Sequence, residues 1–217
     1  MFFKNALLSV YNSPANNPRL IDASQRLLKL GYTLCGSRGT AERVAQAGMP
    51  ITDISNLTGR GPILGHQVVT LDPAVHAGLL ARHTEADYEV LEGQKLLWFD
   101  FLWAALYPLL EAIEAPGATE ESVTKKIDVG GRALLCAGAK LTEPRIVVAS
   151  VDDLEEVFTW MEAHQPNRKK NLRRMAACAE GVVTIYSSWS ADYLAERSIQ
   201  YPHHNGPSLK LEWEGRT

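Results

Sequence analysis

The sequence has little that would place it among disulfide-rich or membrane-spanning proteins. Its 217 residues include three cysteines, and no two of them form a CxxC pair. A sparse, odd number of cysteines indicates free thiols in a reducing compartment. The apolar stretch 96–110 is interrupted by Asp100 and Pro108, and the amino-terminus has no long apolar run, so neither is typical of a membrane span or a signal peptide. We therefore expect a cytoplasmic protein that does not bind membranes.

An excess of charge of one sign is also missing. The chain has 22 Lys and Arg residues against 25 Asp and Glu, a net charge of −3. This balance excludes a broadly basic nucleic-acid binder and an acidic disordered protein. A hydrophobic content of 46% is sufficient for a sizeable core. We expect one domain over residues 1–197, followed by a polar tail, 198–217, without a periodic pattern.

Several common site motifs are absent. The sequence has no GxGxxG fingerprint, and no Walker loop, because the required lysine is missing. The six histidines show no HxxxH or mixed His/Cys spacing, so we expect no metal ion.

Short apolar runs alternate with amphipathic segments along the first 150 residues. The runs predict strands over 6–10, 32–35, 51–54, 67–71, 96–103 and 145–150. Helical spacing predicts helices over 19–30, 41–47, 75–83, 104–113, 119–125, 131–141, 152–164, 167–179 and 182–197. This order predicts an α/β fold, a doubly wound, mostly parallel sheet with appended C-terminal helices.

Ligands of such sheets bind beyond the carboxyl ends of the strands. Residues 36–40 follow a strand and open a helix there, so their backbone N–H groups and the hydroxyls of Ser37 and Thr40 could hold an anion or simply cap the helix. Tyr107, Asp128 and Lys140 could form an acid–base group. Taken singly, residues of these types are more often a packed phenol, a helix cap or a solvated charge than catalytic groups.

Five segments, read in order, resemble the IMP cyclohydrolase domain, the amino-terminal half of the bifunctional purine biosynthesis protein, which has a methylglyoxal-synthase-like fold. The segments are ALLSV (6–10), GSRGTA (36–41), VVTLDPAVHAG (68–78), LYP (106–108) and IDVGG…AK (127–140). The corresponding family patterns are S-V-S-D-K-T-G, S-T/S-G-G-T-A, G-R-V-K-T-L-H-P-K-V-H-G/A-G, N-L-Y-P-F and I-D-I-G-G…A-A-A-K-N. The resemblance continues through 173–194 and covers about residues 6–195.

The resemblance implies closure of the pyrimidine ring of a formamido-imidazole-carboxamide ribotide, a purine precursor, without a cofactor. Proximity and proton transfer are sufficient for this reaction. Asp128 would assist the amide nucleophile, while Lys140 and Tyr107 would stabilise the oxyanion and supply a proton. The family also implies a homodimer. The implied substrate pocket, with Arg38 as its candidate cation, comprises Ser9, Ser37, Arg38, Gly39, Thr40, Gln67, Thr70, Val129, Gly130 and Gly131.

The sequence departs from the family mostly where the family has cationic groups. Ser13, Gln67, Val69 and Ala74 stand in place of basic residues, and Asp72 replaces a histidine. A hydrogen bond to a charged group is worth about 1.5–3 kcal/mol, so these losses weaken the expected phosphate site.

Three interpretations remain open. The chain could close the ring of the normal ribotide with a rebuilt anion site, or act on an altered substrate, such as a nucleoside without the phosphate. It could instead be a non-catalytic relative that binds a small metabolite or a partner protein. Because the chain ends where the family's transformylase half would begin, we also expect a stand-alone domain.

Overall fold

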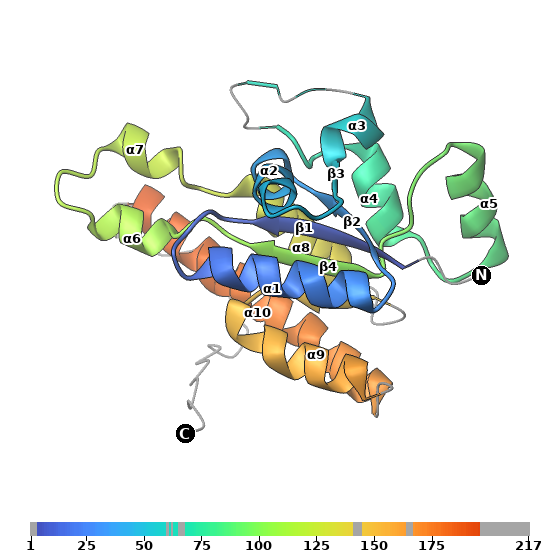
Figure 1. Cartoon of the computed structure of the whole chain (residues 1–217). Helices are drawn as coiled ribbons and strands as arrows, with labels where there is room; N and C mark the ends of the chain where they lie inside the picture. Colours follow the sequence, from blue (N-terminus) through green and yellow to red (C-terminus); the bar gives the residue numbers. More distant parts are fainter. Residues whose placement is uncertain are drawn as a thin grey trace, which may run out of the picture.

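A five-stranded, all-parallel sheet forms the centre of the computed structural model, which describes residues 4–59, 61, 63–64, 68–140, 145–163 and 167–195. The strand order is β3-β2-β1-β4-β5 (Figure 1). The strands are β1 (Asn5–Val10), β2 (Thr33–Gly36), β3 (Thr52–Asp53), β4 (Phe101–Ala105) and β5 (Ile146–Val148). The doubly wound α/β fold that the sequence predicts is confirmed.

Helices cover both faces of the sheet, because alternate residues of a strand point to opposite faces. In β1, Ala6 and Leu8 belong to the apolar cluster formed with α1 (Asn16–Lys29) and α9 (Leu154–Glu162). Leu7 belongs to the opposite cluster, with α3 (Ile54–Thr58), α4 (Pro73–Leu80) and α8 (Val129–Ala139). Continuous apolar runs are therefore typical of these strands.

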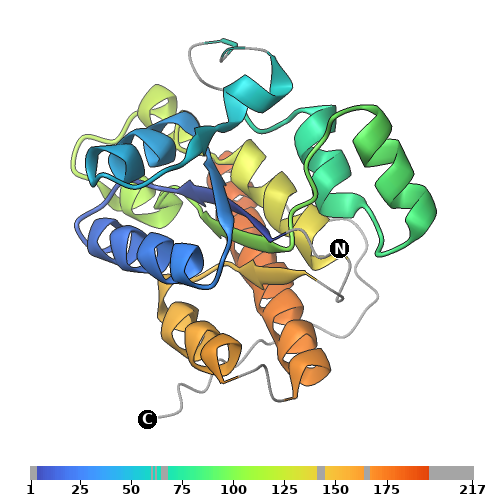
Figure 2. The ribbon, with the colours of Figure 1, turned by 45° about the vertical axis from the view of Figure 1, so that its right-hand side comes forward.

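The long helix α10 (Arg168–Leu194) runs beside α8 and β5 (Figure 2). Its residues Ala176 and Ala179 join the cluster on the α8 side of the sheet, and Leu172 and Met175 join the other. The appended C-terminal helix thus closes the β5 edge of the core. No helix within the described ranges is both long and apolar enough to cross a membrane.

The connections at the carboxyl ends of the strands carry most of the remaining elements. They include α2 (Arg38–Gln46) after β2, and α6 (Leu109–Glu114) and α7 (Glu120–Thr124) between β4 and α8. In Figure 1, α6 and α7 extend beyond the sheet at the left of the view. At the opposite edge, α5 (Glu85–Gly93) precedes β4. A short 3-10 helix, Val151–Asp153, follows β5 at the carboxyl edge and leads into α9.

Some predicted elements are wrong in detail. The strand expected over 67–71 is absent from its described part, where Val68 forms only an isolated bridge with Ile63. The helix expected from 104 begins at Leu109 instead, because β4 extends through Ala105 and Pro108 precedes the first helical turn. The two helices expected over 167–197 are one, α10, and α5 was not expected.

Candidate active site

Asp128 lies at the start of α8, at the carboxyl edge of the sheet. Its carboxylate accepts the backbone N–H of Gly131 at 2.7 Å, so it caps the helix. The hydroxyl of Tyr186 on α10 accepts the backbone N–H of Asp128 at 3.0 Å and donates to the carbonyl of Lys126 at 2.7 Å. Burial raises the pKa of Asp128, against hydrogen bonds from the backbone of Gly131 and Tyr107. A carboxylate with a raised pKa is suited to proton transfer near neutral pH.

Two glycines after Asp128 allow neighbouring side chains to approach the first turn of α8. A Cβ on Gly130 would lie 2.9 Å from the hydroxyl oxygen of Thr70, which is 6% exposed. A Cβ on Gly131 would lie 2.5 Å from Leu106 Cδ2 and 2.7 Å from Asp128 Oδ2. The glycine pair thus leaves room for the Thr70 hydroxyl beside Gly130 and for the Asp128 carboxylate beside Gly131.

Tyr107 and Tyr11 form an aromatic pair next to Asp128 in the fold. Their ring centroids lie 5.1 Å apart in an edge-to-face arrangement. The ammonium of Lys126 lies 5.3 Å from the centroid of Tyr107 and 6.0 Å from that of Tyr11. Tyr107 is 43% exposed, and partial burial, together with the charge of Asp128, raises its pKa. The phenol therefore stays protonated at neutral pH and can donate a proton or a hydrogen bond.

The segment 36–40 forms the start of α2 beside the end of β1. The hydroxyls of Ser37 and Thr40 lie 3.0 Å apart, and Thr40 Oγ1 accepts the backbone N–H of Val10 at 3.0 Å. Ser37 is the N-cap residue of α2, but its side chain makes no capping hydrogen bond. Ser9, half-buried on β1, precedes Val10. The hydroxyls thus connect the carboxyl ends of two adjacent strands rather than only capping the helix.

Arg43 is the cation of this cradle, and sequence analysis missed it. Its guanidinium donates to the carbonyls of Gly39 and Val10, to the side-chain oxygen of Asn17 and to Thr40 Oγ1. All four acceptors are neutral. The sequence does contain a pattern that indicates Arg43. It follows Thr40 by three positions, and residues three apart lie on the same face of a helix. The predicted cation, Arg38, instead forms an exposed ion pair with Glu42 at 3.0 Å.

The other predicted residues lie in different places. Val129 is 54% exposed on the first turn of α8. Lys140 ends α8 and is exposed. Lys140 follows Asp128 by 12 positions, so about 18 Å separate the two residues along α8, which runs back toward the edge where β5 begins. The structure brings Tyr107, Asp128, Thr70, Gly130 and Gly131 together, but it does not bring Lys140 to them. Gln67 lies outside the described residues.

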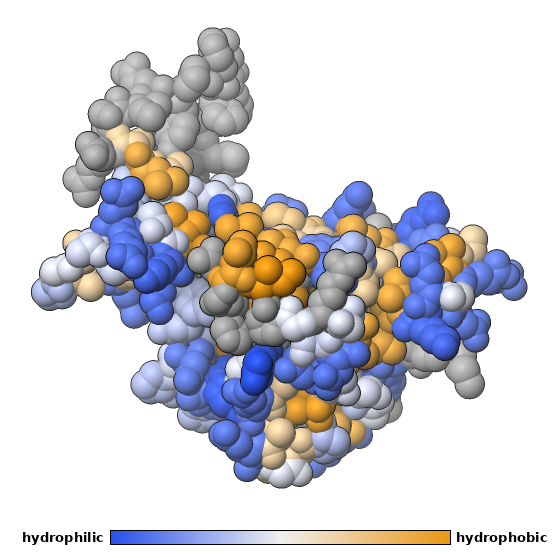
Figure 3. Space-filling view, turned by 90° about the horizontal axis from the view of Figure 1, so that it is seen from above, coloured by the Kyte–Doolittle hydropathy of each residue, from blue (hydrophilic) through white to orange (hydrophobic). Residues whose placement is uncertain are grey.

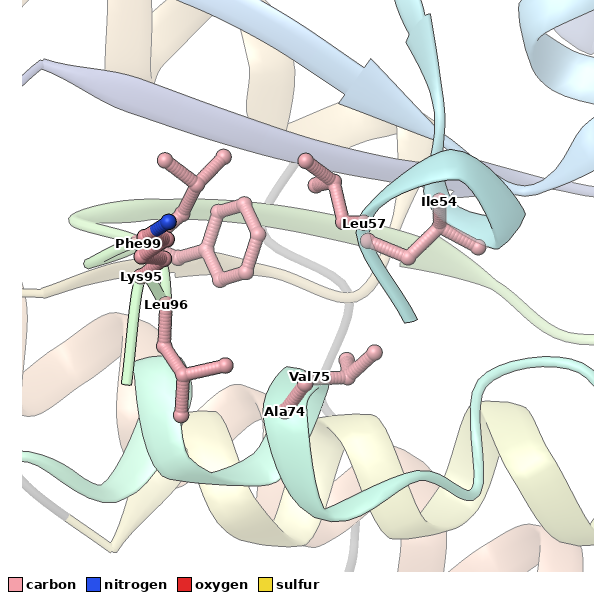
Figure 4. Close-up of a pocket in the computed structure, with 8 residues that line it drawn as sticks. Ile54, Leu57, Ala74, Val75, Lys95, Leu96 and Phe99 are labelled. Carbon is pink, nitrogen blue, oxygen red and sulfur yellow. The ribbon is translucent and has the colours of Figure 1, made fainter. Parts of the chain in front are cut away.

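One cavity is too small for a substrate. Apolar side chains from α3, α4 and the segment before β4, including Leu57, Val75 and Phe99, point into it (Figure 4). Its volume is about 10 Å³, about the space of one water molecule. A larger cavity of about 460 Å³ adjoins Tyr107 and Lys126. No three metal-binding side chains gather among the residues that the structure describes.

An apolar patch lies near the middle of the face seen from above in Figure 3. Separately, the connection between α3 and α4 exposes Ile63, Leu64 and Leu71, which are 51%, 69% and 37% exposed.

Comparisons with known proteins agree with the predicted resemblance. The model of the MGS-like domain family matches residues 19–133, more than half of the chain. The bifunctional purine biosynthesis protein PurH of Listeria monocytogenes is 32% identical over 88% of this chain, and PurH of a Synechococcus strain is 38% identical over 79%. The chain spans 37% and 33% of the lengths of these two relatives.

A solved structure is also similar. The crystal structure of ForH matches with a TM-score of 0.74 and 26% identity, over 91% of this chain and 100% of that chain. The likeness covers the sheet and its helices. The chain therefore belongs to the MGS-like domain family, and it is related within it to the bifunctional purine biosynthesis protein PurH.

Proposed function

We propose that this protein is an IMP cyclohydrolase-like enzyme, which closes the ring of a formamido-imidazole-carboxamide ribotide, or of a modified analogue, with loss of water. The observation that carries the proposal is the convergence of Asp128, Tyr107 and Thr70 around the glycine pair at the start of α8. Kinship with PurH, whose name denotes purine biosynthesis, supports the same chemistry.

The reaction needs a base, a hydrogen-bond donor and a substrate held in a folded conformation. The lone pair of the carboxamide nitrogen attacks the formyl carbon, a C–N bond forms, and the C=O π pair moves to oxygen. The Asp128 carboxylate receives the proton that the nitrogen loses, and the phenol of Tyr107 protonates the oxygen. The C–O bond then breaks as the hydroxyl takes up the proton that the neighbouring ring-forming nitrogen loses, so that the oxygen leaves as water and the nitrogen completes a C=N bond. Proton balance is restored when Asp128 returns its proton to Tyr107 through water.

The anion cradle favours a substrate that carries a phosphate. Arg43 is a partly buried guanidinium whose acceptors in the cradle are all neutral, so its positive charge is not compensated there. The hydroxyls of Ser37 and Thr40 lie beside it. This arrangement supports the interpretation in which a rebuilt anion site binds the normal ribotide, over the one in which the substrate lacks a phosphate.

Turnover assays with two substrates test the proposal. The full chain is incubated with the formylated carboxamide ribotide and with its dephosphorylated nucleoside, and hypoxanthine-type absorbance is followed. We expect turnover of the ribotide, with a weaker reaction of the nucleoside. Asp128→Asn removes the base and should abolish turnover while retaining an oxygen to cap α8. Turnover of neither substrate by the folded protein would favour a non-catalytic relative.

A further inference from the structure

We propose that Lys126 is the cation of the ring-closing site, and that its ammonium binds the oxygen that becomes negative when the amide nitrogen attacks the formyl carbon. This inference rests on the proposed function and adds to it a catalytic residue that the motifs do not identify.

The position of Lys126 is fixed from both its backbone and its side chain. Its carbonyl accepts the hydroxyl of Tyr186, the same hydroxyl that accepts the N–H of Asp128. Its ammonium lies over the rings of Tyr107 and Tyr11. A cation over an aromatic ring is attracted by the negative charge on the ring face. One hydroxyl on α10 thus holds the base and the backbone of the ammonium-bearing residue in a single arrangement.

The charge of Lys126 is available to a ligand. Among the described residues, no carboxylate lies within ion-pair distance of its ammonium, and no hydrogen bond from that ammonium is formed. The adjacent Lys125 differs, because it pairs with Glu121 at 2.6 Å and its side chain is 64% exposed. Lys126 is also one of the residues that line the cavity of about 460 Å³ beside Tyr107. Aromatic faces hold the charge there without using its N–H donors.

Ring closure requires such a charge at this point. When the C–N bond forms, the formyl oxygen becomes an alkoxide, and the amide proton moves to Asp128. An ammonium and a phenol beside the alkoxide stabilise this charge before the oxygen is protonated and leaves as water. The cation implied by resemblance, Lys140, lies at the other end of α8 within this chain. Lys126 is the cation whose ammonium lies beside the ring of the candidate acid, Tyr107.

Kinetics of three variants test the proposal. Lys126→Met keeps the length of the side chain and removes the charge, and Lys125→Met is the matched control. We expect Lys126→Met to lower kcat by about 10²–10³-fold with little change in KM, for ribotide and nucleoside alike. Lys126→Arg should recover part of the activity. An unchanged kcat in Lys126→Met, or equal losses in both Met variants, would overturn the proposal.

A binding measurement separates this proposal from the proposed function. Xanthosine monophosphate carries an oxygen on the ring carbon that derives from the formyl group, whereas IMP carries only hydrogen there. Calorimetry should show that the wild-type chain binds xanthosine monophosphate more tightly than IMP, and that Lys126→Met, but not Lys125→Met, loses this preference. If that preference is seen without any turnover, the proposed function fails and the placement of Lys126 stands. A wild-type chain without the preference would refute the placement of Lys126 even if the ring closes.

Discussion

Tyr186 and Asp128 are joined by a hydrogen bond across 58 residues of sequence, in which the phenol oxygen of Tyr186 accepts the backbone N–H of Asp128 at 3.0 Å. The same oxygen donates its proton to the carbonyl of Lys126 at 2.7 Å. The contact attaches the loop before α8 to the middle of α10, a long helix packed against the β5 edge of the sheet. The candidate base is therefore held by a rigid element rather than by its own loop.

Removal of the Tyr186 hydroxyl should disturb the candidate site more than the apolar core. Tyr186→Phe keeps the ring beside Trp189 but leaves a backbone N–H and a carbonyl without their partner. We expect the free energy of unfolding to fall by about 1–3 kcal/mol, measured by urea denaturation, and kcat to fall with it. Tyr193→Phe, on the same helix, is the control and should change neither quantity. Equal effects of the two variants would mean that the hydroxyl of Tyr186 has no special role.

The acid limb of the pH–rate profile should report Asp128. A general base must be deprotonated, so kcat/KM should fall as the pH falls through its pKa. Burial raises that pKa above the value of about 3.9 for an ordinary aspartate, and the limb should shift upward accordingly. Partial burial also raises the pKa of Tyr107, so the rate should not decline on the basic side until above about pH 10. A flat profile down to the pH of an exposed carboxyl would exclude Asp128 as the base.

The two arginines of α2 should differ in effect. Arg43→Met removes a guanidinium that donates to Gly39, Val10 and Thr40, and should lower the free energy of unfolding by about 1.5–3 kcal/mol. It should also reduce the preference for ribotide over nucleoside by roughly tenfold or more, as loss of one charged hydrogen bond implies. Arg38→Met breaks only the exposed ion pair with Glu42. We therefore expect the free energy of unfolding to fall by less than about 0.5 kcal/mol, with no change in the preference for ribotide over nucleoside. Kinetics with both substrates check this difference.

The sheet could be predicted from the sequence better than the helices around it. Apolar runs marked β1, β2, β4 and β5 because buried parallel strands are apolar on both faces. The same property explains why the boundary between strand and helix within 96–113 was predicted wrongly. A continuous apolar run has no periodicity by which a strand could be distinguished from a helix. Helix α5 was not predicted, because Leu91 is its only buried residue and the helix therefore has no apolar face in the sequence. An expected break near Gly181 did not occur, because packing on α8 and β5 continues along α10.

The site residues that could be predicted belong to motifs on loops, whereas the residues that the sequence did not reveal lie on helices. Tyr107 could be placed at the site because it follows β4 at the carboxyl edge of the sheet. Asp128 and Thr70 do not directly follow a strand, and the resemblance of their motifs placed them with Tyr107. Tyr186 comes from a distant helix, and no local pattern links it to Asp128. The position of Lys140 follows from the same geometry, since a helix that connects parallel strands returns to the opposite edge of the sheet.

Packing around Gly78 provides a test of the core that is independent of the reaction. A Cβ at this position would lie 2.2 Å from the carbonyl oxygen of Leu97 and 2.8 Å from Phe99 Cδ2, so α4 or the chain before β4 would have to move. We expect Gly78→Ala to destabilise the protein by about 1–3 kcal/mol or more. Gly181→Ala has no atom within 4 Å of the new Cβ and should stabilise α10 by about 0.5–1 kcal/mol. Shifts of the urea midpoint in opposite directions for the two variants would confirm both predictions. A Gly78→Ala protein as stable as the wild type would contradict the first.

Stability should fall as the pH rises toward neutrality, because of Asp100 at the edge opposite the site. Burial raises the pKa of Asp100 to about 7, although Arg168, Arg145 and Lys4 act against the rise. Its Oδ1 atom is buried without a hydrogen-bond partner. In the unfolded chain this carboxyl has a pKa near the ordinary value of about 3.9, so between the two values the folded state binds more protons than the unfolded state.

The sign of the pH effect follows from that difference. The contribution of Asp100 is fully present below about pH 4 and is lost as the pH rises through about 7, where a charged carboxylate must stay buried. Asp100→Asn keeps the shape and cannot ionise, so we expect it to exceed the wild type in free energy of unfolding at pH 8 by on the order of 2 kcal/mol. At pH 5 the two proteins should differ little. Urea denaturation at both pH values measures this, and an Asp100→Asn protein that is less stable than the wild type at pH 8 would show that the three cations compensate the buried charge.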